Sequence, residues 1–154
     1  MKKLNLIMLM FFAFCFFGSK AQTYKADDVV GIWFNEEKTA KIQIFSEDNK
    51  YFGRIVWMKT PLDEETGKPK LDKNNPDESL RSRPRMNMII MKNFVFDKDD
   101  EWESGSIYDP DSGKTYKCYM KFESQEKNQL NIRGYIGRAW MGLGRTSYWT
   151  KTTL

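Results

Sequence analysis

Apolar and polar side chains alternate with a period of two along most of this chain. From Ala40 to Ile44, for example, three apolar residues hold the even positions and two polar residues the odd ones. Such alternation predicts β-strands with one face buried and the other in water. The predicted strands are Gly31–Phe34, Thr39–Phe45, Lys50–Met58, Met88–Phe96, Glu101–Tyr108, Lys114–Glu123, Gln129–Ile136 and Leu143–Thr152.

Most links between these strands are short and rich in turn-forming residues, as in Ser46–Asn49, Asp97–Asp100 and Asp109–Gly113. Short antiparallel strands joined in order predict an all-β, eight-stranded antiparallel up-and-down barrel, which leaves no strand edge exposed. A sandwich or an open curled sheet is the alternative. A barrel of this size is just wide enough to hold one small ligand, or it is filled by its own side chains.

The connection Lys59–Asn87 is much longer than the others, polar and proline-bearing. A connection of this length in a compact domain is either functional, as a lid, or disordered. Alternate connections of an up-and-down barrel share one end, so we expect this long loop to form a rim with three other links. We expect any mouth of the barrel at that rim. The links are Asn35–Lys38, Lys59–Asn87, Asp109–Gly113 and Gly137–Gly142.

Residues 1–21 are typical of a secretory signal peptide. Two lysines precede the apolar stretch Leu4–Phe17, and Ser19-Lys20-Ala21 forms a cleavage site before Gln22. The apolar stretch is shorter than the roughly 20 residues that span a bilayer, although an uncleaved anchor is the alternative. We therefore expect a periplasmic or secreted protein in which residues 22–154 form a single domain, with no stable membrane span after cleavage.

Removal of the signal also changes the charge and the cysteine content. The 25 basic residues of the chain fall to 22 against 21 acidic ones, so the net charge falls from +4 to +1. No basic surface suited to nucleic acid is evident. Cys118 is the only cysteine left in residues 22–154, and its alternation with polar neighbours predicts a buried structural role. The chain has no histidine, which excludes Ser–His hydrolysis and disfavours zinc or copper sites.

Several short motifs occur at intervals from the first predicted strand to the last. Gly31-x-Trp33 follows a short helical turn at Tyr24–Val29. The later motifs are Asp72…Asn75-Pro76…Arg81, Trp102-x-x-Gly105, Tyr108-Asp109-Pro110…Gly113-Lys114-x-Tyr116, Arg133-Gly134-Tyr135 and Trp149-Thr150-Lys151. Gly-x-Trp resembles the opening of lipocalins and the wider calycin group. Together the motifs resemble the bacterial domain-of-unknown-function family 2147, over about Val30 to Lys151.

This resemblance implies a small exported protein with a calycin-like barrel and no assigned activity. It also implies structural roles for Gly31 and Trp33, with the tryptophan closing the bottom of the barrel and stacking on an arginine near the chain end. Lys151 stands where that arginine is expected. Lysine lacks the planar guanidinium, so Arg145 is an alternative partner for Trp33.

Polar side chains of the long loop are the first group of candidate binding residues. Arg81, Arg83 and Arg85 lie on one side of an extended segment, and arginine side chains suit carboxylate or phosphate groups. They predict either a clamp for an anionic headgroup or pairs with nearby acids that fix the loop. The acids in reach are Asp72, Asp77, Glu78 and Asp109.

Aromatic side chains near the proposed rim are the second group, and they suit the wall of a small-molecule site. They are Trp57, Trp102, Tyr108 and Trp140, and Trp57 is expected to share a face with Tyr51 and Ile55. A hollow and a filled barrel both stay open, although small inward residues at Ala40, Gly53 and Gly134 favour a hollow one. The candidate ligand-binding residues are Trp57, Asp72, Asn75, Arg81, Arg83, Tyr108 and Trp140.

These residues predict a binding protein rather than an enzyme, because no nucleophile–base pair or metal motif is present. Asp109–Gly113 is interpreted as a plain turn rather than a calcium loop. We expect no catalytic residue, metal or cofactor, and an amphipathic or anionic small molecule at the open rim. The alternative is a structural or interaction protein of the cell envelope with a filled barrel and a protein partner. Paired-carboxylate chemistry at the rim is a third hypothesis.

Overall fold

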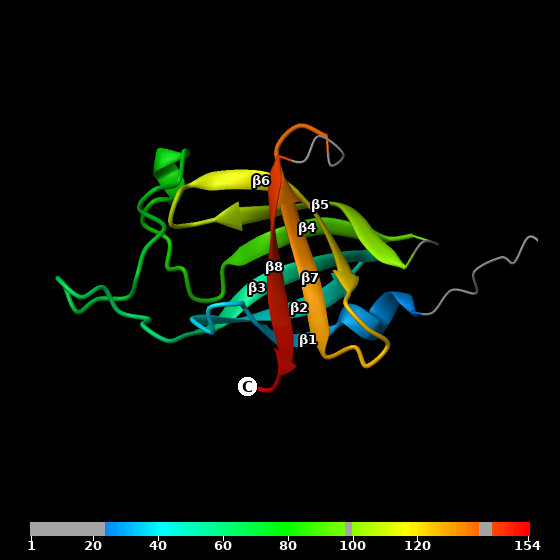
Figure 1. The fold of residues 1–154 in the computed structure, drawn as a ribbon. Helices are drawn as coiled ribbons and strands as arrows, with labels where there is room; N and C mark the ends of the chain where they lie inside the picture. The colour runs from blue at the N-terminus through cyan, green and yellow to red at the C-terminus, as the bar shows by residue number, and fades with distance from the viewer. Residues whose placement is uncertain (1–23, 98–99, 139–142) are drawn as a thin grey trace, which may run out of the picture.

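The computed structural model describes residues 24–97, 100–138 and 143–154. Within them the chain forms eight antiparallel strands and two short 3₁₀ helices. Each strand pairs with the next, and β8 pairs with β1, so the sheet closes into a barrel (Figure 1). The predicted all-β up-and-down barrel is confirmed. The elements are η1 (Ala26–Val29), β1 (Gly31–Phe34), β2 (Ala40–Glu47), β3 (Lys50–Met58), η2 (Glu78–Leu80), β4 (Ile89–Phe96), β5 (Glu101–Asp109), β6 (Lys114–Phe122), β7 (Gln129–Tyr135) and β8 (Gly144–Thr152).

The strand bounds follow the alternation closely, and the largest difference is at the end of β2. This strand continues to Glu47, which pairs with Lys50 across a two-residue turn. Both turn residues, Asp48 and Asn49, have positive φ angles of 49° and 59°. Asp and Asn tolerate this conformation, and such turns match the twist of the strands they join. The predicted signal peptide and the candidate Trp140 lie outside the described residues.

A β-bulge reverses the prediction for Trp57. Lys41 pairs with Trp57 and Ile42 with Ile55, so Val56 is an extra residue in β3. The extra residue turns the end of the strand over. Ile55 therefore faces the barrel interior, whereas Trp57 faces outward and is 37% exposed. The expectation that Trp57 shares a face with Ile55 is wrong, because period-two counting cannot detect a bulge.

The end of the barrel opposite the long loop is closed by η1, which is seated on aromatic side chains. The indole Nε1 of Trp33 donates to the Val29 carbonyl oxygen at 2.9 Å, and that of Trp102 donates to Ala26 at 2.9 Å. Both indoles are fully buried. Trp102 thus belongs to the closed end, and its placement near the rim is wrong, because β5 begins at the closed end.

Tight packing fills the half of the barrel nearest η1. A Cβ atom on Gly53 would lie 2.7 Å from the Met91 sulfur, and one on Gly105 would lie 2.4 Å from the Phe94 ring. These glycines leave room for large side chains, so Gly53 serves packing rather than a cavity. Cys118 is fully buried in the same core, and burial raises the pKa of its thiol to about 12. This burial agrees with the predicted structural role.

The basic partner of Trp33 is Lys151 rather than Arg145. The Lys151 ammonium lies 5.5 Å from the centre of the Trp33 ring. Arg145 lies near the start of β8, at the opposite end of the barrel, where its guanidinium pairs with Glu37 at 3.1 Å. The alternative that Arg145 replaces the stacking arginine is therefore wrong. In the described parts of the chain, no helix combines the length and the apolar character needed to cross a membrane.

Candidate functional site

The half of the barrel away from η1 is hollow. A cavity of about 960 Å³ opens at the end that carries the long loop. This volume is at the upper end of the range of small-molecule sites. Its walls are mainly aliphatic and aromatic side chains from the inner face of the sheet, with Trp149 among them. The wall residues include Ala40, Ile42, Ile55, Met58, Ile90, Ile107, Tyr116, Ile132, Gly134 and Trp149.

Small inward residues contribute to this space, as expected for two of the three candidates Ala40, Gly53 and Gly134. Ala40 and Gly134 both line the cavity. A Cβ atom on Gly134 would meet only ordinary contacts, at 3.6 Å from Tyr116 and 3.8 Å from Ile107. A larger side chain at this position would therefore extend into the cavity without a backbone clash. The hollow barrel, rather than the filled one, is the form that the structure has.

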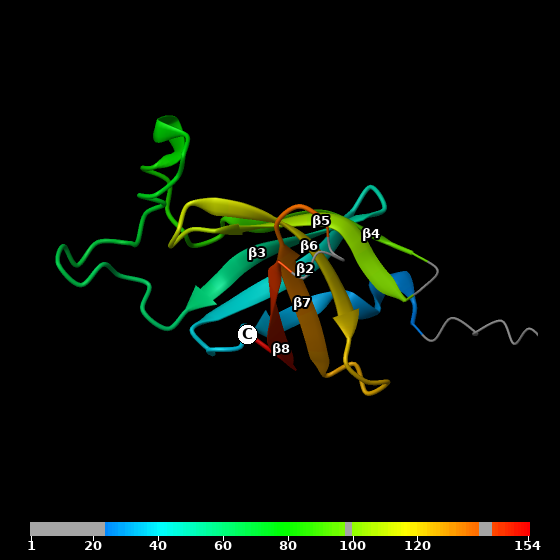
Figure 2. The ribbon, with the colours of Figure 1, turned by 45° about the horizontal axis from the view of Figure 1, so that its top comes forward.

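The long loop is ordered along its length and lies beside the mouth. Two isolated β-bridges, Leu62 to Pro69 and Leu71 to Pro84, fold it back on itself. It projects away from the barrel next to the β5–β6 turn (Figure 1, Figure 2). Thr60, Lys70 and Arg85 are its contributions to the cavity wall. The loop is thus neither a disordered insertion nor a lid across the opening; it is a fixed arm at one side.

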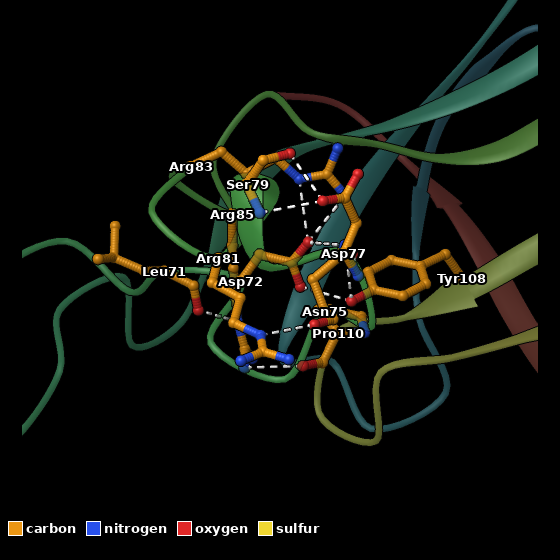
Figure 3. Close-up of polar contacts among 10 residues, drawn as sticks. All are labelled: Leu71, Asp72, Asn75, Asp77, Ser79, Arg81, Arg83, Arg85, Tyr108 and Pro110. Atoms are coloured by element: carbon orange, nitrogen blue, oxygen red, sulfur yellow. Dashed lines mark hydrogen bonds and ion pairs between the residues drawn. The ribbon is translucent and has the colours of Figure 1, made fainter.

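A buried carboxylate fastens this arm to β5 (Figure 3). Asp72 is fully buried and accepts four hydrogen bonds. The Tyr108 hydroxyl donates at 2.6 Å and Asn75 Nδ2 at 2.7 Å, while Arg83 donates twice, from Nε at 2.9 Å and Nη2 at 2.8 Å. A buried charge is tolerated when it is paired and hydrogen-bonded in this way. Asp72 therefore joins the loop to the barrel.

The same contacts set the pKa values of the buried pair. Burial raises the pKa of Asp72, but hydrogen bonds from Tyr108, Asn75 and Arg83 outweigh it, so the net shift is downward. Burial and then the hydrogen bond to Asp72 raise the pKa of Tyr108 to about 12. At neutral pH the carboxylate is ionised and the phenol is protonated, which is the combination that this hydrogen bond requires.

Two more of the candidate binding residues are used within the loop. Asn75 Oδ1 accepts from the backbone N–H of Asp77 at 2.9 Å, and its carbonyl oxygen accepts from Arg81 Nε at 2.8 Å. Arg81 also pairs with Glu78. One cluster therefore holds the loop together, and it consists of Asp72, Asn75, Arg81 and Arg83. This arrangement matches the second of the two predicted roles for the arginines, in which they pair with nearby acids and fix the loop. Of the described candidate binding residues, Tyr108 also lines the cavity, whereas Trp57 does not.

The turn Asp109–Gly113 is the second attachment of the loop. Arg85 binds the carboxylate of Asp111 and donates to the Pro110 carbonyl oxygen at 3.0 Å. Asn74 Nδ2 donates to the Asp111 carbonyl oxygen at 2.7 Å. Gly113 has a φ of 69°, and a Cβ atom there would lie 1.9 Å from the Asn74 carbonyl oxygen. The plain turn is present, and it serves as a docking point for the loop.

We expect Gly113→Ala to detach the loop at this point. The left-handed backbone alone costs about 1–2 kcal/mol for a residue with a Cβ atom, and the clash with Asn74 adds to it. Limited proteolysis should then cut the exposed Lys68 and Lys73 region faster while the barrel stays folded. Gly67→Ala is the matched control, since Gly67 also has positive φ but would contact nothing. Equal proteolysis of the two variants would contradict the docking role.

The cation that sequence reasoning missed is Lys70. It lines the cavity mouth, and its ammonium donates to the Thr60 hydroxyl at 3.0 Å. Within the described residues no carboxylate lies within ion-pair distance of it. Arg85, by contrast, has three acceptors, and Arg145 is paired with Glu36 and Glu37. Lys70 carries no motif, so its position depends on how the loop folds.

A family comparison agrees with this geometry. Residues 31–151 match the model of a family described as "Uncharacterized protein conserved in bacteria (DUF2147)". The chain belongs to this family. The resemblance found in the short motifs is confirmed, over the range that they span. No curated protein matches the chain.

Comparison with solved structures shows the fold of this family member independently. The chain is similar to a structure described as "Protein HP1028 from the human pathogen Helicobacter pylori belongs to the lipocalin family". The TM-score is 0.67 and the identity 22%, over 81% of this chain and 83% of that one. Likeness at this identity shows the fold, which is a lipocalin-like barrel. Such a barrel with an open cavity has the form needed to hold a small molecule.

In the described ranges, no three His, Cys, Asp or Glu side chains lie together as metal ligands. The carboxylates near the mouth have other roles. Asp109 accepts from the Asp111 N–H and the Ser112 hydroxyl within its own turn. The expectation that the chain is not an enzyme stays a prediction.

Proposed function

We propose that this protein is an exported carrier of a small amphipathic molecule with an anionic headgroup. The observation that supports it most is the cavity of about 960 Å³, with apolar walls and an ammonium group at its mouth. The apolar body of the ligand would lie between β2, β3, β5 and β7, and the headgroup would stay at the rim. The ligand class is inferred from the chemistry of these cavity residues, within the lipocalin-like fold.

The depth of the cavity supports the apolar half of the proposal. Ile42, Ile132 and Trp149 are almost fully buried at its inner end, next to the filled half of the barrel. Transfer of apolar surface from water to such walls gains about 25 cal/mol per Å². An alkyl chain or a flat apolar ring system is therefore the favoured occupant of this end.

Lys70 supports the anionic half. Its ammonium has three donor hydrogens, and one hydroxyl acceptor is assigned to it among the described residues. Among the described residues, the other basic side chains that line the cavity are Arg85 and Arg145, and both are paired with carboxylates. A carboxylate or phosphate that entered the mouth would thus meet one cation with donors to spare. Export is supported by the signal-like residues 1–21, and it places the carrier in the periplasm or outside the cell.

Titration with decanoate and with 1-decanol tests this function, followed by the change in tryptophan fluorescence. We expect both to bind, with decanoate the tighter. Gly134→Leu should weaken both, because its side chain occupies the cavity. Lys70→Gln should weaken decanoate by about tenfold and leave decanol almost unchanged, since one charge-assisted hydrogen bond is lost.

The matched control is Lys68→Gln, an exposed lysine of the same loop that does not line the cavity. It should bind both ligands as the unmodified protein does. The carrier function would be contradicted if neither ligand bound the unmodified protein, or if Gly134→Leu bound both ligands as tightly as the unmodified protein does. An equal loss of decanoate affinity in the Lys70→Gln and Lys68→Gln variants would contradict the role of Lys70 but not the carrier function.

A further inference from the structure

We propose that the open rim docks on the surface of an anionic lipid bilayer, so that the cavity mouth faces the membrane. This inference rests on the proposed function, since an amphipathic ligand would then enter from the bilayer. The docking surface is the rim arc, which we define as residues 34–41, 57–59, 136–138 and 143–145. These residues lie at the open ends of β7, β8, β1, β2 and β3, which are consecutive strands of the closed barrel.

Exposed apolar side chains stand at the mouth on this arc. Ile136 and Leu143 are 64% and 63% exposed, and both line the cavity opening. The Ile136 N–H donates to the Leu143 carbonyl oxygen at 3.0 Å, so the two residues are neighbours at the base of one link. Aliphatic side chains that stay about two-thirds exposed at a cavity mouth contribute little to the stability of the folded monomer. They fit a surface that buries them on contact.

An aromatic and cationic cluster continues the arc on the outer face. Phe34, Lys41 and Trp57 are in register across β1, β2 and β3. The Phe34 and Trp57 rings meet edge to face at 5.9 Å, and the Lys41 ammonium lies 5.0 Å and 5.7 Å from their centres. Tryptophan beside lysine is typical of the bilayer interface, where the ring sits among the headgroups and the ammonium reaches phosphate.

The charge of the arc favours an anionic surface. It holds five cations, Lys38, Lys41, Lys59, Arg138 and Arg145, and two acids, Glu36 and Glu37. Both acids pair with Arg145. The arc therefore carries a net charge of +3, although the whole chain after cleavage would carry only +1. Concentration of the positive charge around exposed apolar tips is the pattern that attracts a protein to acidic lipid.

The β-bulge at Val56 gives this cluster its geometry. Without the extra residue Trp57 would face inward beside Ile55 and narrow the cavity. With it, Met58 lines the cavity while Trp57 joins Phe34 outside. One local irregularity thus both widens the mouth and places an indole on the rim arc. The two effects serve a carrier that takes its ligand from a membrane.

The test is flotation with vesicles of phosphatidylethanolamine and phosphatidylglycerol, compared with phosphatidylcholine alone. The experiment uses residues 22–154, which contain every described residue. Residues 1–21 are left out because the apolar stretch Leu4–Phe17 would itself bind lipid. We expect binding to the anionic vesicles and little to the neutral ones, with a loss as salt is raised.

Two rim variants and two matched controls locate the contact. Ile136→Ser with Leu143→Ser should lower the vesicle partition coefficient on the order of tenfold. Lys41→Gln should lower it about fivefold. Val95→Ser and Lys50→Gln should leave it unchanged, because Val95 is 42% exposed and Lys50 is exposed but both lie toward the closed end. Equal losses in rim variants and controls would overturn the proposal.

The decanoate titration separates this inference from the proposed function. Lys41→Gln protein that binds decanoate normally but no longer binds the vesicles supports docking as a distinct property, because Lys41 does not line the cavity. Normal decanoate binding with no vesicle binding by the unmodified chain would overturn docking and leave the carrier function intact. Light scattering of the same samples shows whether the rim arc instead binds a second copy of this chain. A dimer that the rim variants dissociate, together with no lipid binding, would also overturn the docking proposal.

Discussion

Replacement of Trp33 by alanine is expected to lower the free energy of unfolding by about 4 kcal/mol, measured by urea denaturation. The indole is fully buried between η1 and the ring of Phe122, whose centre lies 6.0 Å away. Its removal leaves a large cavity at the closed end and takes away the hydrogen bond to the Val29 carbonyl oxygen. It also removes the ring beneath Lys151. The first two losses fall on the contact that seats η1.

Trp57→Ala is the matched control for this prediction. The same side chain is removed there, but from a half-exposed position on the outer face, so we expect a loss of about 1 kcal/mol or less. Trp33→Phe should lie between the two, because it keeps most of the packing and loses the indole N–H. Similar losses for Trp33→Ala and Trp57→Ala would show that the closed end does not depend on Trp33.

Replacement of Asp72 by alanine is expected to cost about 3 kcal/mol of unfolding free energy. The change leaves the Tyr108 hydroxyl, Asn75 Nδ2 and Arg83 without their shared acceptor. Arg83 can regain water, because its side chain is 35% exposed, whereas the other two donors are more enclosed. The long loop should loosen at its attachment to β5, and proteolysis within residues 59–88 should accelerate.

Asp111→Ala is the comparison, since it removes an ion-paired carboxylate whose side chain is 84% exposed. An ion pair whose carboxylate is this exposed contributes about 1 kcal/mol or less, and Arg85 keeps its two backbone acceptors when Asp111 is replaced. A pH series gives a second readout. The folded pKa of Asp72 is lowered, so its stabilisation is complete above its unfolded pKa of about 3.9 and is lost as pH falls through the folded pKa. Asp72→Ala should therefore flatten the acid side of the stability profile, and an unchanged profile would contradict the assignment.

The fold could be predicted from the sequence because the barrel depends on a simple repeating pattern. Alternation over each strand fixes which face is buried, and short links fix which strands are neighbours. The role of Trp33 at the closed end came from the resemblance of Gly31-x-Trp33 to the opening of lipocalins, whereas its basic partner was left open between Lys151 and Arg145. Local patterns were sufficient here, since each strand pairs with the one that follows it in the chain.

The binding site was predicted less well, for two physical reasons. A single inserted residue at Val56 reversed the face of Trp57, and nothing in the alternation marks such a bulge. The long loop folds by contacts between residues far apart in sequence, such as Asp72 with Tyr108 and Arg85 with Asp111. Those contacts use the conspicuous charges for structure and leave the inconspicuous Lys70 at the mouth. Charge in a sequence indicates that partners exist but not which groups they are.

Native mass spectrometry of the protein purified gently from its own cells can show whether the hollow barrel carries an amphipathic anion. We expect a retained mass of one small molecule per chain, which is released at high collision energy and detected as an anion. The Gly134→Leu variant, purified in the same way, should lack it. Unmodified protein that shows only the mass of the bare chain, even at the lowest collision energy, would contradict the claim.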